Sequence, residues 1–110
     1  ASVHGIAPAA MLGRLFRLFG ADAVIFPSYG GRFGWSDRTC ARLAAALRDP
    51  WDPLRRSLPT PAGGMALDRI EELLRFYGRD VMVLVGGSLY LAGDRLAERT
   101  REFVATVRGA

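Results

Sequence analysis

Lysine is absent from this sequence, so all 15 of its strongly basic side chains are arginines. Without lysine the chain offers no Schiff-base amine, no carbamylated lysine and no P-loop lysine. Arginine stays charged at physiological pH and suits planar, two-pronged contacts with phosphate or carboxylate groups. The composition therefore excludes several lysine-dependent chemistries and is compatible with the recognition of anions.

Cysteine and long apolar runs are also scarce. Cys40 is the single cysteine, which excludes an internal disulfide framework and indicates a reducing compartment. It has no nearby histidine, so we interpret it as a small buried residue rather than a nucleophile. No run approaches the roughly 18 apolar residues of a membrane span, and no signal peptide is visible. The sequence predicts a cytoplasmic protein with no membrane partner.

Length, composition and charge indicate one small globular domain. Half of the 110 residues are hydrophobic and 24% are charged, which is typical of folded proteins. The net charge of +4 raises nucleic acid as a partner, to be tested by steep salt-dependent binding. Because the arginines are scattered and often neighbour acidic residues, we interpret them as solvated helix faces and expect no nucleic acid partner.

The first predicted element is a helix over Pro8–Phe19. Proline suits the first turn of a helix, and Gly20 is a typical residue just past its end. Arg14 and Arg17 fall outside the apolar face. The spacing predicts that this face packs inward through Met11, Leu12, Leu15, Phe16 and Phe19.

Three short apolar segments follow, each leading through a loop into a helix. The segment 23–26 has no polar alternation and predicts a strand buried on both faces. The segment 57–60 is either an apolar turn or a short strand, because Pro59 and Pro61 weaken the strand interpretation. The segment 81–85 is Val-Met-Val-Leu-Val and predicts the clearest strand.

Three further helices are predicted from apolar spacing. Ser36 is a suitable N-cap for a helix over residues 37–48, and Gly78 ends a helix over residues 66–77. The last helix covers residues 94–107. The residues expected to face inward are Leu43 and Leu47 in the first of these helices, Leu67, Ile70, Leu73 and Leu74 in the second, and Leu96, Phe103, Val104 and Val107 in the third.

The order of elements indicates an α/β fold. One helix followed by three strand–loop–helix units is typical of βαβ connections and of parallel strands. Three parallel strands alone would leave open strand edges, so we expect the chain to be part of a larger sheet.

Glycine pairs follow the predicted strands. They are Gly30–Gly31, Gly63–Gly64 and Gly86–Gly87. The carboxyl ends of parallel strands form the binding face of α/β proteins, and glycine there lets backbone N–H groups approach a phosphate. The alternative is that glycine merely permits tight strand-to-helix turns. Two pairs after successive strands favour phosphate binding by Gly63, Gly64, Gly86 and Gly87.

Four segments in series resemble the RuBisCO and RuBisCO-like proteins. The first, His4–Ile6 with Leu12–Asp22, resembles the region of the family's fifth helix, and the second, Ala23–Phe33, is similar to strand six and loop six. The third, Leu58–Met65, is similar to the strand-seven motif that ends in Ser-Gly-Gly. The fourth, Val83–Ser88, is similar to the strand-eight Gly-Gly-Gly motif. The resemblance implies that residues 1–110 form the C-terminal portion of a (β/α)₈ TIM barrel, namely helix 5 and strand–helix units 6 to 8. We expect the family's N-terminal α+β domain and strands 1 to 5 to be absent from this chain.

Departures from the family pattern imply a reaction other than CO₂ fixation. Arg32 stands where RuBisCO has the loop-six lysine, and it implies a mobile positive charge over the reacting end of the substrate. Ile25 and Ala62 replace a phosphate-holding histidine and the serine of Ser-Gly-Gly. His4 matches a histidine at the edge of the family's active site, and its role is either catalytic or structural. The resemblance implies enolisation, isomerisation or decarboxylation of a phosphorylated sugar or sugar acid.

The family's metal ligands have no counterpart in this sequence. Its carbamylated lysine and two magnesium-binding carboxylates lie on strand two, so Mg²⁺ is expected only in a full-length parent, with no metal ligand in this chain. We expect this chain to be an inactive fragment when alone. The parent protein is expected to bind a sugar-phosphate substrate through the complete barrel and to form a homo-oligomer. The alternative is a stand-alone half-barrel that binds phosphate or pairs with a second copy without catalysis.

Overall fold

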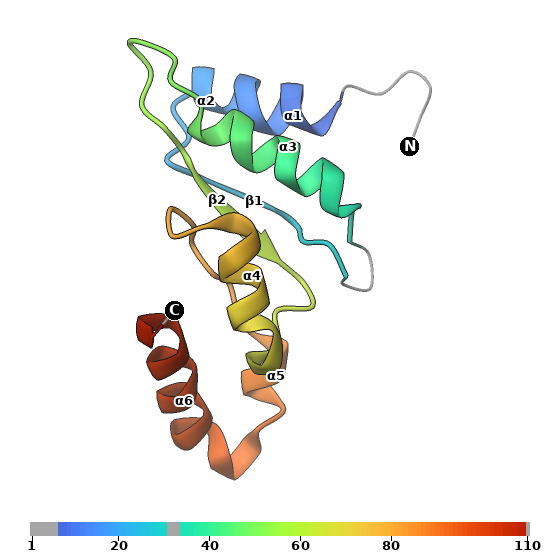
Figure 1. The fold of residues 1–110 in the computed structure, drawn as a ribbon, viewed down its shortest axis with the longest axis vertical. Coiled ribbons are helices and arrows are strands. Elements are labelled where there is room, and N and C mark those ends of the chain that lie inside the picture. The colour runs from blue at the N-terminus through green and yellow to red at the C-terminus, as the bar shows by residue number, and fades with distance from the viewer. Residues whose placement is uncertain (1–6, 31–33, 110) are drawn as a thin grey trace.

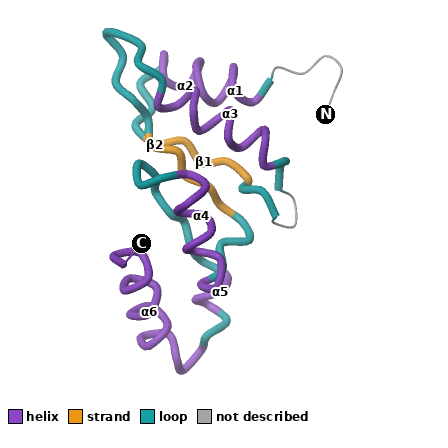
Figure 2. Tube along the Cα trace, viewed as in Figure 1, coloured by secondary structure: helices purple, strands orange, loops and turns teal. Residues whose placement is uncertain are grey.

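The computed structural model describes residues 7–30 and 34–109, and Figure 1 shows their arrangement. Two parallel strands form a small sheet, and helices pack against it (Figure 2). In chain order the elements are α1 (Pro8–Ala10), η1 (Met11–Leu15), α2 (Phe16–Leu18), β1 (Ala23–Pro27), α3 (Asp37–Arg48), β2 (Leu58–Ala62), η2 (Leu67–Arg69), α4 (Ile70–Tyr77), α5 (Gly87–Tyr90), η3 (Gly93–Arg95) and α6 (Leu96–Gly109). The α/β class with parallel strands is confirmed.

The first helix is confirmed, but of its predicted inner face only Leu12 packs against the core, and the other residues are exposed. Elements α1, η1 and α2 follow one another without a break, and the middle one is a π-helical turn. Gly13 and Arg17 are buried on the side of α3, whereas Phe19 is 86% exposed. A Cβ at Gly13 would lie 2.7 Å from the Cβ of Ala46, so glycine is what permits this close approach to α3.

Arg17 is buried because backbone carbonyls satisfy its guanidinium. Its Nη1 donates to the Ala46 carbonyl at 2.7 Å, and its Nη2 donates to the Arg55 carbonyl at 3.1 Å. Its guanidinium also lies 5.6 Å from the ring centroid of Trp51. A cation near the last carbonyls of α3 is favourable because these groups carry partial negative charge. Amphipathic spacing placed this arginine outside the core, and specific hydrogen bonds place it inside.

Residues 58–60 of the predicted segment 57–60 belong to strand β2. Strand β2 pairs in parallel with β1, in a register that sets Val24 opposite Pro59 and Pro27 opposite Ala62. The Leu58 N–H donates to the Asp22 carbonyl at 2.8 Å. Alternate residues of a strand direct their backbone groups to opposite edges, so Pro59 and Pro61 turn their nitrogens away from β1. The prolines therefore do not interrupt this ladder.

The predicted strand at 81–85 is wrong as a regular strand, and the same prolines explain why. The segment runs beside β2, and the Met82 N–H donates to the Pro59 carbonyl at 2.9 Å. No regular ladder joins the two segments within the described part of the chain, where the sheet consists of β1 and β2. Pro59 and Pro61 have no N–H to donate toward this segment. At these two positions, the edge of β2 that faces residues 81–85 can therefore only accept hydrogen bonds.

The prediction that β1 is buried on both faces is also wrong. Val24 and Phe26 are buried against the helices, while Ile25 between them is 62% exposed. Met82 and Leu84 are similarly exposed, and Val81, Val83 and Val85 pack against the core. One face of the sheet is thus covered by helices. The other face leaves Ile25, Met82 and Leu84 exposed, because no described element covers these three side chains.

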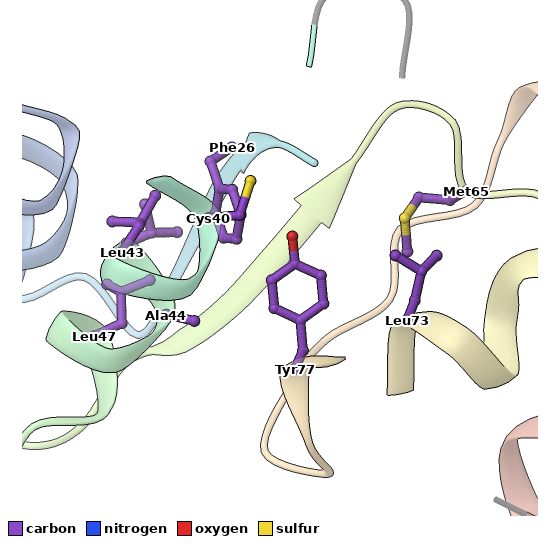
Figure 3. Close-up of a cluster of buried hydrophobic side chains, with 9 residues drawn as sticks. Phe26, Cys40, Leu43, Ala44, Leu47, Met65, Leu73 and Tyr77 are labelled. Carbon is purple, nitrogen blue, oxygen red and sulfur yellow. The ribbon is translucent and has the colours of Figure 1, made fainter. Parts of the chain in front are cut away.

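The core lies between the sheet and helices α3 and α4. Leu43 and Leu47 of α3 are fully buried, as predicted, and Ser36 caps this helix by accepting the Thr39 N–H at 3.2 Å. Leu73 and Tyr77 of α4 join the same cluster, with Phe26 and Cys40 on the side of α3 (Figure 3). Gly78 ends α4 with a φ of +80°, as its position predicts. These two helices hold the strand ends in place.

Helix α6 exists as predicted but does not bury its predicted inner residues. None of its described side chains is buried, and Leu96 and Val104 are 48% and 40% exposed. The radius of gyration of 15.0 Å exceeds the roughly 13 Å expected of a compact domain of about 100 residues. The C-terminal helix therefore packs loosely on α4. No helix in the described part of the chain is long and apolar enough to cross a membrane.

Candidate phosphate-binding site

The carboxyl ends of β1 and β2 lie side by side at one edge of the sheet. Pro27 is opposite Ala62, and the Ser28 N–H donates to the Ala62 carbonyl at 2.8 Å. The Gly63–Gly64 turn therefore begins beside the residues that follow β1. This placement is the one expected for the binding face of a parallel sheet.

Glycine at positions 63 and 64 is required by the backbone. Gly63 and Gly64 have φ values of +82° and +66°, in the left-handed region that other residues rarely adopt. A Cβ built on Gly63 would meet no atom within 4 Å. The space in front of this turn is open, so the glycine serves the conformation of the turn rather than the packing of a neighbour.

The Gly86–Gly87 turn follows the extended segment next to β2. Figure 1 shows this segment and β2 running in the same direction, toward α5. Leu58 bonds to the Asp22 carbonyl and pairs with Ala23, so Met82, which bonds to the Pro59 carbonyl, lies level with Thr60. A count of four residues along each segment then places Gly86 level with Gly64. Cβ atoms at Gly86 and Gly87 would also meet nothing within 4 Å. The two turns thus lie at the same end of neighbouring segments, as the phosphate hypothesis requires.

The remaining predicted site residues are placed differently. His4 and Arg32 lie outside the described residues. Ile25, which stands where the family has a histidine, points to the uncovered face of the sheet. Ala62 is half-buried at the end of β2, directly before the glycine turn. The structure places both glycine turns at the same end of neighbouring segments, and the phosphate-binding role of the four glycines, like the roles of His4 and Arg32, stays a prediction.

Arg69 is a site residue that the sequence pattern did not single out. Its Nη1 donates to the Gly64 carbonyl at 3.0 Å, and its Nη2 donates to the Tyr29 carbonyl at 3.3 Å. Its Nε pairs with the Glu72 carboxylate at 3.2 Å. The arginine follows Gly64 by five residues and looks like an ordinary first-turn residue, so only the tertiary structure reveals that it joins two strand ends.

A buried hydroxyl pair supports the end of β1 from behind. The hydroxyls of Ser28 and Tyr77 share a hydrogen bond of 3.0 Å, and both side chains are almost fully buried. Burial raises the pKa of the Tyr77 hydroxyl far above its usual value, so this group stays neutral. The pair fixes the strand end to α4 and contributes no charge to the site.

Cys40 has the structural role predicted for it, and Trp51 also has a structural role. Cys40 is fully buried, with its thiol 3.5 Å from the Pro27 carbonyl, and burial raises the pKa of this thiol. The guanidinium carbons of Arg14 and Arg17 lie 5.7 and 5.6 Å from the ring centroid of Trp51. Neither side chain has the environment of a nucleophile or of a free stacking platform.

Two other observations limit where a ligand can bind. Residues 7–30 and 34–109 contain no group of three or more His, Cys, Asp or Glu side chains that could hold a metal ion. A cavity of about 730 Å³ lies between α4, residues 81–83 and α6, and its lining includes Leu74, Phe103 and Val107. This cavity is in the helix layer, away from the glycine turns, and we attribute it to the loose packing of α6.

Parallel strands joined by helices, with glycine turns at their carboxyl ends, define an α/β protein of the kind that binds ligands at that edge. No protein-family model matches the chain. It is 57% identical over 107 residues to ribulose bisphosphate carboxylase-like protein 1 of Rhodopseudomonas palustris and 59% identical over 105 residues to the 5-methylthioribulose-1-phosphate isomerase of Rhodospirillum rubrum. These alignments cover 97% and 96% of this chain but 29% and 28% of the two relatives.

A solved structure leads to the same family. The RuBisCO-like protein from Rhodopseudomonas palustris matches with a TM-score of 0.82 and 53% identity, over 94% of this chain and 27% of that one. The chain belongs to the RuBisCO-like proteins, which confirms the resemblance seen in its motifs. It spans less than a third of the length of these relatives.

Proposed function

We propose that this chain is the C-terminal segment of the (β/α)₈ barrel of a RuBisCO-like enzyme that acts on a phosphorylated sugar. Its glycine turns would supply the phosphate site. The order of the helix, strands and glycine turns supports this assignment, as does the match to less than a third of the relatives' length. The uncovered face of the sheet also supports it, because that face needs further strands or another layer.

The position of the two turns carries the proposal. Gly63–Gly64 and Gly86–Gly87 follow neighbouring parallel segments, and Cβ atoms at Gly63, Gly86 and Gly87 would meet no atom within 4 Å. Backbone N–H groups at such turns donate to phosphate oxygens, and glycine allows the close approach. The phosphate is thereby held without a lysine, in a chain that has none.

The proposed reaction class is isomerisation through an enolised sugar phosphate. A relative with 59% identity bears the name of an isomerase of 5-methylthioribulose 1-phosphate, and this similarity supports the assignment. Such a reaction moves a proton between neighbouring carbons, so the substrate must keep one orientation. In the proposal the glycine turns fix the phosphate end, Arg32 places positive charge near the reacting oxygens, and His4 orients or transfers a proton.

The magnesium ion of the proposed parent enzyme would be bound elsewhere. The described residues do not fit a metal site, since no acidic or histidine cluster occurs among them. We therefore assign the Mg²⁺ ligands to residues outside this chain. When bound there, Mg²⁺ would stabilise negative charge on substrate oxygens.

An activity assay tests the proposal. The whole natural polypeptide that contains residues 1–110 should convert 5-methylthioribulose 1-phosphate in the presence of Mg²⁺, with product followed by ¹H and ³¹P NMR. Ribulose 1,5-bisphosphate with CO₂ serves as the comparison and should give no carboxylated product, since Arg32 replaces the loop-six lysine. Absence of turnover with the methylthio-sugar and related sugar phosphates would reject the enzymatic assignment.

The apolar face of the sheet favours a second candidate function, which is self-association without catalysis. Ile25, Met82 and Leu84 are exposed there, and a second copy of the chain could cover them. Sedimentation of the 110-residue chain separates the candidates. A stable dimer that binds no sugar phosphate would favour the self-associating module over the barrel segment.

A further inference from the structure

Arg69 makes contacts that join the backbone after β1 to the turn after β2. One guanidinium bonds the Tyr29 carbonyl on the β1 side and the Gly64 carbonyl on the β2 side. Its side chain is 23% exposed, so most of the group is shielded from water. We propose that Arg69 is a positioning residue that fixes the orientation of the Gly63–Gly64 turn for phosphate binding. This inference rests on the proposed function.

The Gly63–Gly64 turn needs such a restraint. Consecutive glycines have wide conformational freedom, and ordering them when a ligand binds weakens the binding. The Gly64 carbonyl accepts hydrogen bonds from Arg69 Nη1 and from the Ala66 N–H, each at 3.0 Å. Because the peptide unit is planar, fixing this carbonyl also fixes the orientation of its whole peptide plane. Arg69 therefore orders the turn before any phosphate arrives.

The same guanidinium restrains the residues after β1. The Tyr29 ring lies 5.3 Å from the Arg69 guanidinium carbon, in cation–π contact. Gly30 has a φ of +77° and lies so close that a Cβ there would be 3.0 Å from Arg69 Nη2. The backbone at Gly30 therefore rests directly on the guanidinium. One arginine thus contacts the backbone that follows both strands.

Arginine is specifically suited to this role. Its planar fork presents several N–H donors in fixed directions, so Nη1 and Nη2 reach two carbonyls while Nε pairs with Glu72. A lysine would carry the same charge, but its single ammonium group cannot reproduce this geometry. A comparison of arginine, lysine and glutamine at position 69 therefore separates positioning from charge.

The test measures the affinity for inorganic phosphate in the whole natural polypeptide that contains residues 1–110. Isothermal titration with phosphate and a thermal melt are recorded for Arg69→Gln, Arg69→Lys and the wild type. We expect about tenfold weaker phosphate binding in both variants, because hydrogen bonds from a charged donor typically contribute at least this factor. The folded fraction at the titration temperature should stay unchanged.

Two control variants isolate the carbonyl contacts. Arg75→Gln removes the same charge from the neighbouring helix α4, where Arg75 is 80% exposed and pairs with Glu71. Glu72→Gln removes the ion pair of Arg69 and leaves its bonds to the two carbonyls. Both controls should keep the phosphate affinity within about twofold of the wild type, since exposed ion pairs contribute little.

Each outcome decides between the hypotheses. Wild-type affinity in Arg69→Gln, or full recovery in Arg69→Lys, would overturn the positioning role while leaving the phosphate site intact. Absence of phosphate binding in the wild type would instead reject the proposed function. If Arg69→Gln does not fold, Gly30→Ala tests the same contact by displacing the guanidinium, with Gly93→Ala as the control for backbone strain. Unchanged phosphate affinity in Gly30→Ala would then contradict the inference.

Discussion

Gly63 and Gly93 provide a matched pair of residues for testing the phosphate site. Both have positive φ values, +82° and +57°, and a Cβ at either position would meet no atom within 4 Å. Alanine at either position should lower stability by about 1–2 kcal/mol, the typical strain of a left-handed non-glycine residue. Only Gly63→Ala should also weaken phosphate binding, by about tenfold, because it reorients donor groups of the site.

Isothermal titration and urea unfolding of the two variants check this prediction. Equal phosphate affinities for Gly63→Ala and Gly93→Ala would show that Gly63 serves only the turn. The result would then favour the interpretation of the glycine pairs as tight strand-to-helix connections.

Cys40 should react with thiol reagents only when the protein unfolds. The side chain is fully buried, and burial raises the pKa of its thiol. The folded state therefore retains the thiol proton at a pH where the unfolded chain, with a thiol pKa of about 8.5, releases it. The stabilisation linked to this proton is complete below about pH 8.5 and decreases as the pH rises through the higher pKa of the folded state.

Labelling with iodoacetamide at pH 8, with and without urea, measures this difference. We expect slow labelling of the folded protein and rapid labelling in urea. Rapid labelling under native conditions would contradict the buried position of Cys40, and a Cys40→Ala variant provides the unlabelled control.

At the scale of elements, β2 shows how well local sequence patterns predict strands. The prolines at 59 and 61 argue against a strand when each residue is judged alone, yet their nitrogens face away from β1 and the parallel pair forms. The same prolines deprive the segment 81–85 of hydrogen-bond donors, although its Val-Met-Val-Leu-Val pattern favours a strand. Strand formation depends on which edge each residue faces, and that information is not in the local pattern.

Replacing Pro61 with valine tests this account. Pro61 is buried, and valine has a similar volume, so the core should accept it. The new N–H would face the segment 81–85 and should find a carbonyl there, which would protect it from hydrogen exchange. Amide exchange followed by NMR measures the protection. Rapid exchange of the new amide at position 61 would contradict the proposed role of the missing donors.

For the whole molecule, the helices and the positions of the glycine turns could be predicted from the sequence. Which face of the sheet is covered by helices could not be predicted. Capping residues, helical spacing and glycine placement are local signals, and they predicted α3, α4 and the positions of both turns. The burial of Arg17, the contacts of Arg69 with two strand ends and the exposure of Ile25 depend on distant segments. Apolar patterns do not show which partner covers an apolar side chain.

Ile25 tests whether the open face of the sheet is covered in the natural protein. It is 62% exposed in this chain, so Ile25→Ser should have little effect on stability if the face is solvated. If the rest of a barrel covers it, the same change should lower the unfolding free energy of the whole natural polypeptide by about 2–4 kcal/mol. Leu91→Ser, at a position that is 84% exposed near the end of α5, is the control. Urea unfolding of the two variants distinguishes these outcomes, and equal small effects would contradict the barrel assignment.

The position of a bound phosphate tests the central claim most directly. A crystal structure of the whole natural polypeptide with inorganic phosphate should show the ion between the turns at 63–64 and 86–87. Its oxygens should lie about 2.7–3.2 Å from backbone nitrogens of both turns. A phosphate bound elsewhere, or turns whose N–H groups point in different directions, would contradict the account.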